Sequence, residues 1–295
     1  FQYVLSLSSS FGWVPEYAQW HPPYEEHCET CCIKDMIQCG LTLAKMGYEE
    51  YWDVVNRFAR NQLIENQIKD GSFLASKVED SREDTEDGWT WKNLDERIVG
   101  GFSGGAEPNS ISLARFRSIA GCCVGTAPQA IAMVYENAVT EEDGDVWVNM
   151  PIDCESDAAA VATGYPREGF VQATMKKAGN LHIRVADWMG PVSLAVNGKD
   201  VPALRVGNAV KAPGLESGDE VRLSHPLRTE VRPETSRGVN YQVFWRGPDV
   251  VKLEPKGLPL RLYVRTRAEQ EEVERERAKR ESTTGHEVKP TNQKG

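Results

Sequence analysis

The sequence contains no apolar run of about 18 residues, which is the shortest length that reads as a membrane-spanning helix. It also lacks an excess of positive charge: 34 Lys and Arg stand against 44 Asp and Glu, for a formal net charge of −10. Proteins bind nucleic acids largely through basic side chains that neutralise phosphates. The sequence therefore predicts no membrane segment and no nucleic-acid partner, and it favours a neutral or cationic small ligand.

Other familiar signals are missing as well. The start, "FQYVLSLSSSFGW", has no basic region and no cleavage site, so no signal peptide is predicted and the chain reads as beginning inside a domain. The glycine-rich stretch "VGGFSGGAEPNS" is not followed by Gly-Lys-Ser/Thr, which excludes a phosphate-binding P-loop and predicts a loop beside a site. The acidic stretch 79–88 does not match the spacing of an EF-hand, so it predicts a solvated loop, with calcium binding as a weak alternative.

The cysteines are few but concentrated. Three of the seven lie in "HCETCC" at residues 27–32, and two more are adjacent at Cys122-Cys123. An odd count without repeated spacing does not fit a small secreted disulfide framework. It favours a reducing compartment, and we expect a cytoplasmic location. The two groups of thiols could form disulfides, fill an apolar core, or make two halves of one metal site.

The first 144 residues read as mainly helical. Apolar residues recur at i, i+3 and i+4 between residues 30 and 68, interrupted at Gly47, which predicts a helical hairpin. A third helix is predicted with Thr126 as its N-cap and Pro128 in its first turn. The second helix is predicted to bury Trp52, Val55, Phe58, Ala59 and Leu63. The third is predicted to bury Ile131, Val134, Tyr135 and Ala138.

From Asp145 the pattern changes to short segments rich in β-branched and aromatic residues, separated by Gly, Pro, Asn and Asp. Such a pattern is typical of an all-β sandwich, and we place it at residues 145–266. The segment 267–295 carries charge on nearly every face, which predicts a solvated helix or a disordered tail.

Zinc accepts thiolate, imidazole and carboxylate ligands in a tetrahedron. Glu29 and Cys31 do not face each other on a regular helix, but at the irregular start of one they can point the same way. Adjacent Cys122 and Cys123 are predicted to need a non-helical backbone, which the neighbouring glycines permit. Spacing alone leaves zinc binding and apolar filling as equal alternatives.

The stretches "YEEHCETCCIKDMIQCGLTLAKM", "GGF", "GCC" and "VYENAVTEEDGDVWVNMPI" resemble glycoside hydrolase family 127, the β-L-arabinofuranosidases. The segments "TGYPREGFV", "LHIRVADW", "VSLAVNG", "LESGDEVRL" and "FWRGPDVVKLE" resemble that family's C-terminal strands in the same order. The resemblance runs from about residue 12 to residue 262. It implies an α+β multidomain fold: the C-terminal part of an (α/α)6-barrel at 1–144, followed by the all-β sandwich.

The resemblance also implies a chemistry. The family binds zinc through its Glu-x-Cys and Cys-Cys motifs, which correspond here to Glu29, Cys31, Cys122 and Cys123. The first cysteine of the pair, Cys122, corresponds to the nucleophile of a retaining glycosidase. A zinc cofactor and a carbohydrate substrate, an L-arabinofuranoside or a related sugar, are therefore expected.

The chain departs from the family pattern at the general acid. The family has a Gly-Glu pair where this chain has Gly12-Trp13, so Glu16, the nearest carboxylate, becomes the candidate acid and base. The fallback candidates are Glu25 and Glu26. We expect His27 to be a surface residue or a neighbour of the ligands, not a ligand.

A second departure follows the cysteine pair, where Val124-Gly125-Thr126 replaces the family's Pro-Pro-Asn. Only a few of the helices of a complete barrel are predicted, so the chain resembles the C-terminal half of an enzyme. A missing N-terminal half or a homo-oligomer would then cover its apolar helix faces. The alternative is a non-catalytic fragment with a structural zinc site and a sandwich that binds carbohydrate or a partner.

Overall fold

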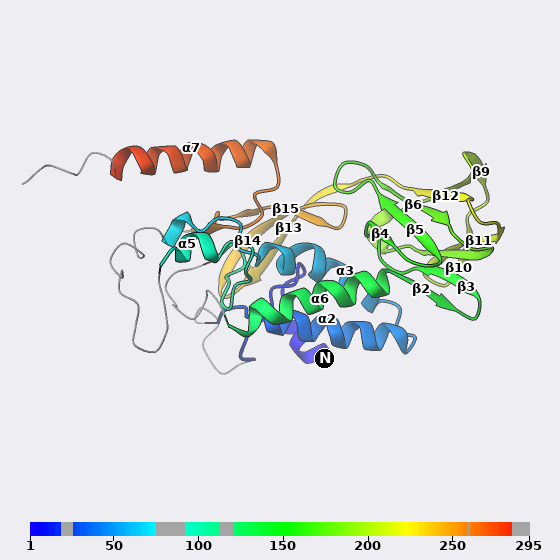
Figure 1. The fold of residues 1–295 in the computed structure, drawn as a ribbon, viewed down its shortest axis with the longest axis horizontal. Helices are drawn as coiled ribbons and strands as arrows, with labels where there is room; N and C mark the ends of the chain where they lie inside the picture. The colour runs from blue at the N-terminus through cyan, green and yellow to red at the C-terminus, as the bar shows by residue number, and fades with distance from the viewer. Residues whose placement is uncertain (19–25, 75–91, 112–120, 259, 285–295) are drawn as a thin grey trace, which may run out of the picture.

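The computed structural model describes residues 1–18, 26–74, 92–111, 121–258 and 260–284 (Figure 1). Helices gather in the first half of the chain, and most strands follow residue 138, giving an α+β fold with several sheets. Within these ranges no helix has the length and apolar character required to cross a membrane. The predictions for the acidic loop at 79–88 and for Glu25 lie outside the described residues.

The helices are α1 (Gln2–Leu7), α2 (Thr30–Lys45), α3 (Tyr51–Phe58), α5 (Leu94–Arg97), α6 (Cys122–Ala138) and α7 (Arg267–Thr284). The predicted break between α2 and α3 is confirmed at Gly47, whose φ of +97° suits glycine. A π-helical turn, η2 (Ala59–Leu63), continues α3. The side chains predicted to be buried on α3 and η2 are confirmed: Trp52, Val55, Phe58, Ala59 and Leu63.

The start of α6 differs from the prediction. The helix begins at Cys122 with Gly121 as N-cap, so the prediction of Thr126 as the cap is wrong. Gly121 has a φ of +149°, and this conformation turns the chain into the helix five residues earlier than predicted. The hydroxyl of Thr126 instead donates to the carbonyl oxygen of Cys122 at 3.2 Å, inside the first turn. Pro128 accordingly lies within the helix.

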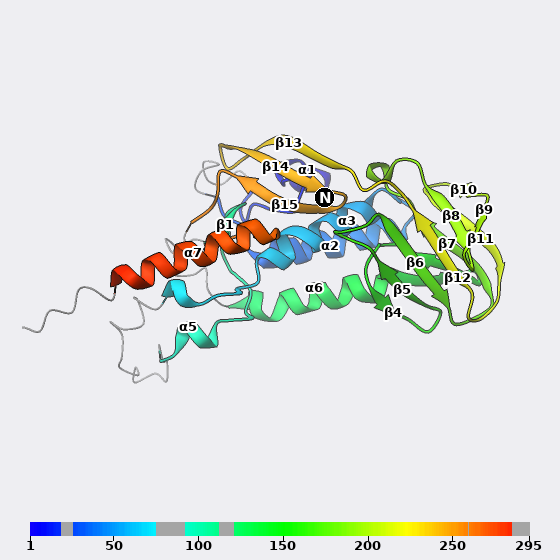
Figure 2. The same cartoon turned by 90° about the horizontal axis from the view of Figure 1, so that it is seen from above.

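The buried face of α6 also differs in part from the prediction. Val134 and Ala138 are buried, as predicted, but Ile131 and Tyr135 are 39% and 46% exposed. The buried face contains Ala127 and Ala130 in their place. These small side chains let α6 pack closely against α2, and the two helices lie side by side in both views (Figures 1 and 2).

Two large sheets follow α6. The five-stranded sheet has the order β10-β11-β7-β3-β2, and all its pairs are antiparallel except β3 with β7. Its strands are β2 (Val139–Glu142), β3 (Asp145–Val148), β7 (Gly179–Arg184), β10 (Leu204–Val206) and β11 (Ala209–Leu215). The six-stranded sheet contains β4 (Cys154–Glu155), β5 (Ala159–Thr163), β6 (Phe170–Met175), β8 (Ser193–Val196), β9 (Lys199–Val201) and β12 (Glu220–Ser224). Buried and less buried residues alternate along β3, β6 and β12, as expected of strands with one face in a core.

The last strands form a sheet of their own, ordered β13-β14-β15. They are β13 (Thr229–Ser236), β14 (Val239–Arg246) and β15 (Asp249–Glu254), and they lie over the helical part (Figures 1 and 2). Arg60 of η2 pairs with both carboxylate oxygens of Asp249, at 3.0 and 3.1 Å. The short strands β1 (Ser110–Ile111) and β16 (Leu260–Arg261) pair with each other. The segment assigned to the sandwich therefore also contributes strands to the helical part.

A buried polar network attaches the C-terminal segment to the helices. The carboxylate of Glu65, 3% exposed, accepts from the backbone of Tyr263 and from the guanidinium of Arg265, both at 2.8 Å. Burial alone would raise the pKa of Glu65, but Arg265 and Lys69 lower it below its ordinary value. The ionised pair therefore stabilises the fold.

We predict that Glu65→Ala lowers the free energy of unfolding at pH 7 by about 3 kcal/mol, because the buried N–H of Tyr263 loses its acceptor and Arg265 loses its closest carboxylate. The folded-state pKa of Glu65 is depressed. Its contribution is therefore fully present above the unfolded pKa of about 4.3 and disappears as the pH falls through the lower folded value. Urea titrations at pH 7 and near pH 3 should show the difference between wild type and variant shrinking in acid.

The matched control is Glu271→Ala, which removes the exposed i,i+4 partner of Arg267 and should change the stability little. Equal losses in the two variants at pH 7 would show that the Glu65 network does not hold the C-terminal segment.

Candidate functional site

The two cysteine groups meet where α2 and α6 begin. Glu29 is the N-cap of α2, and Cys31 is the second residue of that helix. Cys122 and Cys123 are the first two residues of α6. One ligand atom from each of these four residues lies within 4.8 Å of all the others. We call this group the cysteine cluster.

Glu29 has the extended backbone expected at an irregular helix start, with φ −83° and ψ 132°. This conformation lets Glu29 and Cys31 point the same way, as predicted. The prediction of a non-helical backbone at Cys122 and Cys123 is wrong, because both are helical. Side chains in the first turn of a helix lean towards its N-terminus, so two adjacent ones can reach a common point beyond the helix end.

The contacts within the cluster are short. The Sγ of Cys122 donates to Oε1 of Glu29 at 2.8 Å, and the Sγ of Cys123 lies 3.7 Å from the same oxygen. The Sγ atoms of Cys31 and Cys123 are 3.5 Å apart, and the hydroxyl of Thr126 is 3.0 Å from the Sγ of Cys31. Thr126, which the sequence suggested only as a cap, is therefore a direct neighbour of the cluster.

The electrostatics of the cluster favour a cation. Hydrogen bonds with Glu29 and with Cys31 raise the pKa of Cys122 to about 11, and burial raises the pKa of Cys123 even further. Without a positive charge these thiols hold their protons, because ionised neighbours would repel one another. A bound divalent ion reverses this preference, and the N-termini of α2 and α6 add positive potential.

The donor set fits a metal that prefers sulfur. Three thiols and one carboxylate are ligands that zinc accepts, and sulfurs in a tetrahedron with bonds of about 2.3 Å lie about 3.8 Å apart. The observed 3.5 Å between Cys31 and Cys123 is close to that separation. Among the residues that the structure describes, no other group of three or more His, Cys, Asp or Glu side chains converges in this way.

The start of α2 is fixed from the other side by the glycine-rich segment. The hydroxyl of Thr30, fully buried, donates to the carbonyl oxygen of Ser103 at 2.6 Å. The backbones of Cys28 and Ala106 exchange two hydrogen bonds of 2.8 Å. Gly101 lies next to α6, since a side chain at this position would place its Cβ 3.9 Å from the side chain of Val124. The segment therefore borders the first turns of both helices, as a loop beside a site was expected to do.

The remaining cysteines have other surroundings. Cys28 is buried, and burial raises the pKa of its thiol to about 12. Burial also raises the pKa of Cys32, and that of Cys154 to about 11. Cys39 is exposed, and none of the seven cysteines forms a disulfide. Three cysteines thus share the cluster, whereas Cys28 and Cys154 behave as the apolar fillers that the sequence also allowed.

The candidate acid, Glu16, lies beside His27, the first residue of the stretch "HCETCC". The carboxylate of Glu16 forms an ion pair with the imidazole of His27, and their backbones are joined by a 2.9 Å hydrogen bond. Glu26 is buried, and one of its carboxylate oxygens accepts from the backbone of Tyr17 at 3.3 Å. The structure thus places Glu16 and His27 together, and neither belongs to the cysteine cluster.

We predict that the metal-free chain binds one cobalt(II) ion per molecule, with the charge-transfer absorbance of cobalt–thiolate bonds. Cys31→Ser and Cys123→Ser should each weaken cobalt binding by more than about 100-fold. Removing a residue that only supports a metal ligand already lowers metal affinity by about 10–100-fold, and these two residues would be ligands themselves. Cys39→Ser, which removes an exposed thiol from the same α2, is the matched control and should bind as the wild type does. Equal affinities in all variants would show that the cluster is not a metal site.

Comparison with known proteins gives likeness in structure only. The sequence matches no family model and no curated protein. A GH127 β-L-arabinofuranosidase from Geobacillus stearothermophilus T6 superposes with a TM-score of 0.56 and 18% identity, over 82% of this chain and 40% of that one. A structure described as a glycoside hydrolase gives a TM-score of 0.53 and 18% identity, over 78% of this chain and 38% of that one.

A third structure, a GH127 β-arabinofuranosidase, gives a TM-score of 0.52 and 16% identity, over 78% of this chain and 37% of that one. The chain thus spans at most 40% of the length of these three structures. The fold supports the relationship that the motifs indicated: this chain shares its architecture with part of the GH127 β-L-arabinofuranosidases.

Proposed function

We propose that this chain is part of a zinc-dependent, retaining glycoside hydrolase of the β-L-arabinofuranosidase type. The observation that carries the proposal is the cysteine cluster, in which residues from two distant segments converge within 4.8 Å. The shared fold supports a carbohydrate substrate. The seven free thiols of the chain suit a reducing compartment, and we propose that the protein is cytoplasmic.

Glu29, Cys31, Cys122 and Cys123 would hold the zinc ion. When bound, zinc would supply positive charge that keeps the thiols ionised near neutral pH. Cys122 is the most exposed of the four and already borders solvent, which a nucleophile must do to reach a substrate. We therefore assign the nucleophilic thiolate to Cys122.

The reaction then needs an acid that becomes a base. The Sγ of Cys122 attacks the anomeric carbon, and the glycosidic oxygen leaves with a proton from the acid. The resulting carboxylate takes a proton from water, whose oxygen attacks the same carbon and releases the thiolate. We assign the acid to Glu16, and the imidazole of His27 would orient its carboxylate.

The neighbours are more than twice as long as this chain, so the complete site can require further residues. We propose that a companion N-terminal half or a second copy supplies them. The competing proposal is a non-catalytic role, in which the metal stabilises the helix starts and the β-rich part binds carbohydrate or a partner. That role requires the metal but not Glu16.

We predict that Cys122→Ser abolishes hydrolysis of an aryl β-L-arabinofuranoside, because a neutral hydroxyl replaces the thiolate. Cys39→Ser should keep the wild-type rate, measured as release of the aryl alcohol. Hydrolysis that persists in Cys122→Ser would assign the nucleophile to another residue. A zinc-loaded wild type that stays inactive even when assembled with the companion half or as a homo-oligomer would favour the non-catalytic role.

We also predict that Glu16→Gln lowers kcat by about 10²–10⁴-fold, the usual contribution of a general acid, while the zinc content stays at the wild-type level. Elemental mass spectrometry measures the zinc, and the same aryl substrate measures the rate. The rate should recover in part with a substrate whose leaving group needs no proton. Unchanged kinetics would move the acid role to another carboxylate, with Glu26 next in line.

A further inference from the structure

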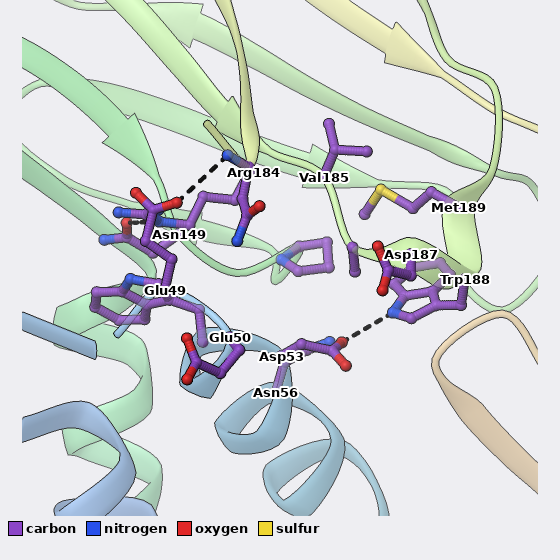
Figure 3. A pocket seen from close by; sticks show the side chains of 14 residues that line it. Glu49, Glu50, Asp53, Asn56, Asn149, Arg184, Val185, Asp187, Trp188 and Met189 are labelled. Atoms are coloured by element: carbon purple, nitrogen blue, oxygen red, sulfur yellow. Dashed lines mark hydrogen bonds and ion pairs between the residues drawn. The ribbon is translucent and has the colours of Figure 1, made fainter. Parts of the chain in front are cut away.

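A cleft lies between α3 and the chain that leaves β7, at a place that shares no residue with the cysteine cluster (Figure 3). Its cavity has a volume of about 200 Å³. Its lining includes Trp52 and Asn56, one turn apart on α3. Arg184 and Trp188 line it from the chain at and after the end of β7 (Figure 3). We call it the α3 cleft.

The lining of the α3 cleft contains polar atoms without partners. Asn56 is 2% exposed, and neither its amide nitrogen nor its amide oxygen has a hydrogen-bond partner. The indole nitrogen of Trp52, 5% exposed, has none either. Buried polar groups are almost always hydrogen-bonded, because leaving one unpaired costs its full desolvation. These atoms therefore call for a polar occupant of the cavity.

The walls are held in place by contacts of their own. Arg184 donates to the side-chain oxygen of Asn149 at 2.9 Å and pairs with Glu49 at 3.1 Å. Its guanidinium lies over the ring of Trp52, 5.4 Å from the centroid. Asp53 accepts from the indole nitrogen of Trp188 at 2.9 Å (Figure 3). Fixed walls reduce the entropy lost when a ligand binds.

The charges around the cleft select the class of ligand. Glu49, Glu50, Asp53 and Asp187 face one cationic lining residue, Arg184, so an anion is disfavoured. A bound metal ion is also disfavoured, because among the described residues only the cysteine cluster brings three or more candidate ligand groups together. Carboxylates and amides that surround an aromatic ring suit a neutral ligand rich in hydroxyl groups.

The size of the cavity limits the ligand to a small one. A water molecule occupies about 30 Å³ in the liquid, so about 200 Å³ holds roughly six waters or one ring of about ten non-hydrogen atoms. We propose that the α3 cleft binds one neutral monosaccharide unit, as a carbohydrate site separate from the cysteine cluster. The proposal rests on the lining of the cleft and does not depend on zinc or on Cys122.

The test is a titration of the full chain carrying Cys122→Ser, which prevents turnover at the cluster. L-Arabinose, D-xylose, D-glucose and D-galactose are added in the millimolar range, and binding is followed by saturation-transfer NMR and tryptophan fluorescence. At least one sugar should bind, and Asn56→Leu should weaken it by about tenfold or more through loss of the buried amide. Asn240→Leu, at an exposed position in β14, is the matched control and should bind unchanged.

Glu50→Gln gives a second, independent arm at the exposed rim, with Glu142→Gln in β2 as its control. If Asn56→Leu does not fold, the comparison of Glu50→Gln with Glu142→Gln tests whether the sugar binds in the cleft. Weaker binding in the cleft variants alone supports the proposal. Binding that is equal in all variants places the sugar elsewhere, and the absence of any binding shows that the cleft holds water only; either result overturns the proposal.

Discussion

The candidate site depends on the fact that α2 and α6 begin at the same place. A helix start leaves backbone N–H groups unpaired and carries partial positive charge, which favours anionic ligands nearby. Two such starts in contact give a place where three thiols and a carboxylate can accumulate, provided that a cation offsets their mutual repulsion. The alanine face of α6 permits the close approach to α2. Because β2 follows α6 without a break, the same helix also positions the first large sheet.

Much of this arrangement could be predicted from the sequence. The apolar periodicity located α2 and α3 and the residues that α3 and η2 bury, and the resemblance brought the four cluster residues together. Apolar periodicity did not locate the start of α6, because that start depends on the backbone conformation of Gly121, which the spacing of apolar residues does not indicate. Ile131 and Tyr135 fit a helical pattern but lie on a face that α2 does not cover, because apolar spacing shows that a helix has a face without showing which neighbour packs against it.

The cysteines illustrate the same limit on a smaller scale. Cys28, Cys31 and Cys32 lie within five residues, yet only Cys31 reaches the cluster. Cys28 precedes the helix and is directed into the core by its backbone pairing with Ala106. Cys32 is rotated by about 100° from Cys31 around α2, as successive helical residues are. The final sheet gives a long-range example: the pairing of Arg60 with Asp249, 189 positions apart, has no signature in local spacing.

The α3 cleft and the cysteine cluster lie at opposite ends of α2. The cluster is at the N-terminus of this helix, whereas the first lining residues of the cleft, Glu49 and Glu50, follow its C-terminus. A helix of 16 residues is about 24 Å long, so one monosaccharide cannot contact both places. Each place must therefore bind its ligand with its own residues. Substitutions that far apart and without shared partners should act additively on binding and stability, so a chemical role for the cluster and a binding role for the cleft can be separated experimentally.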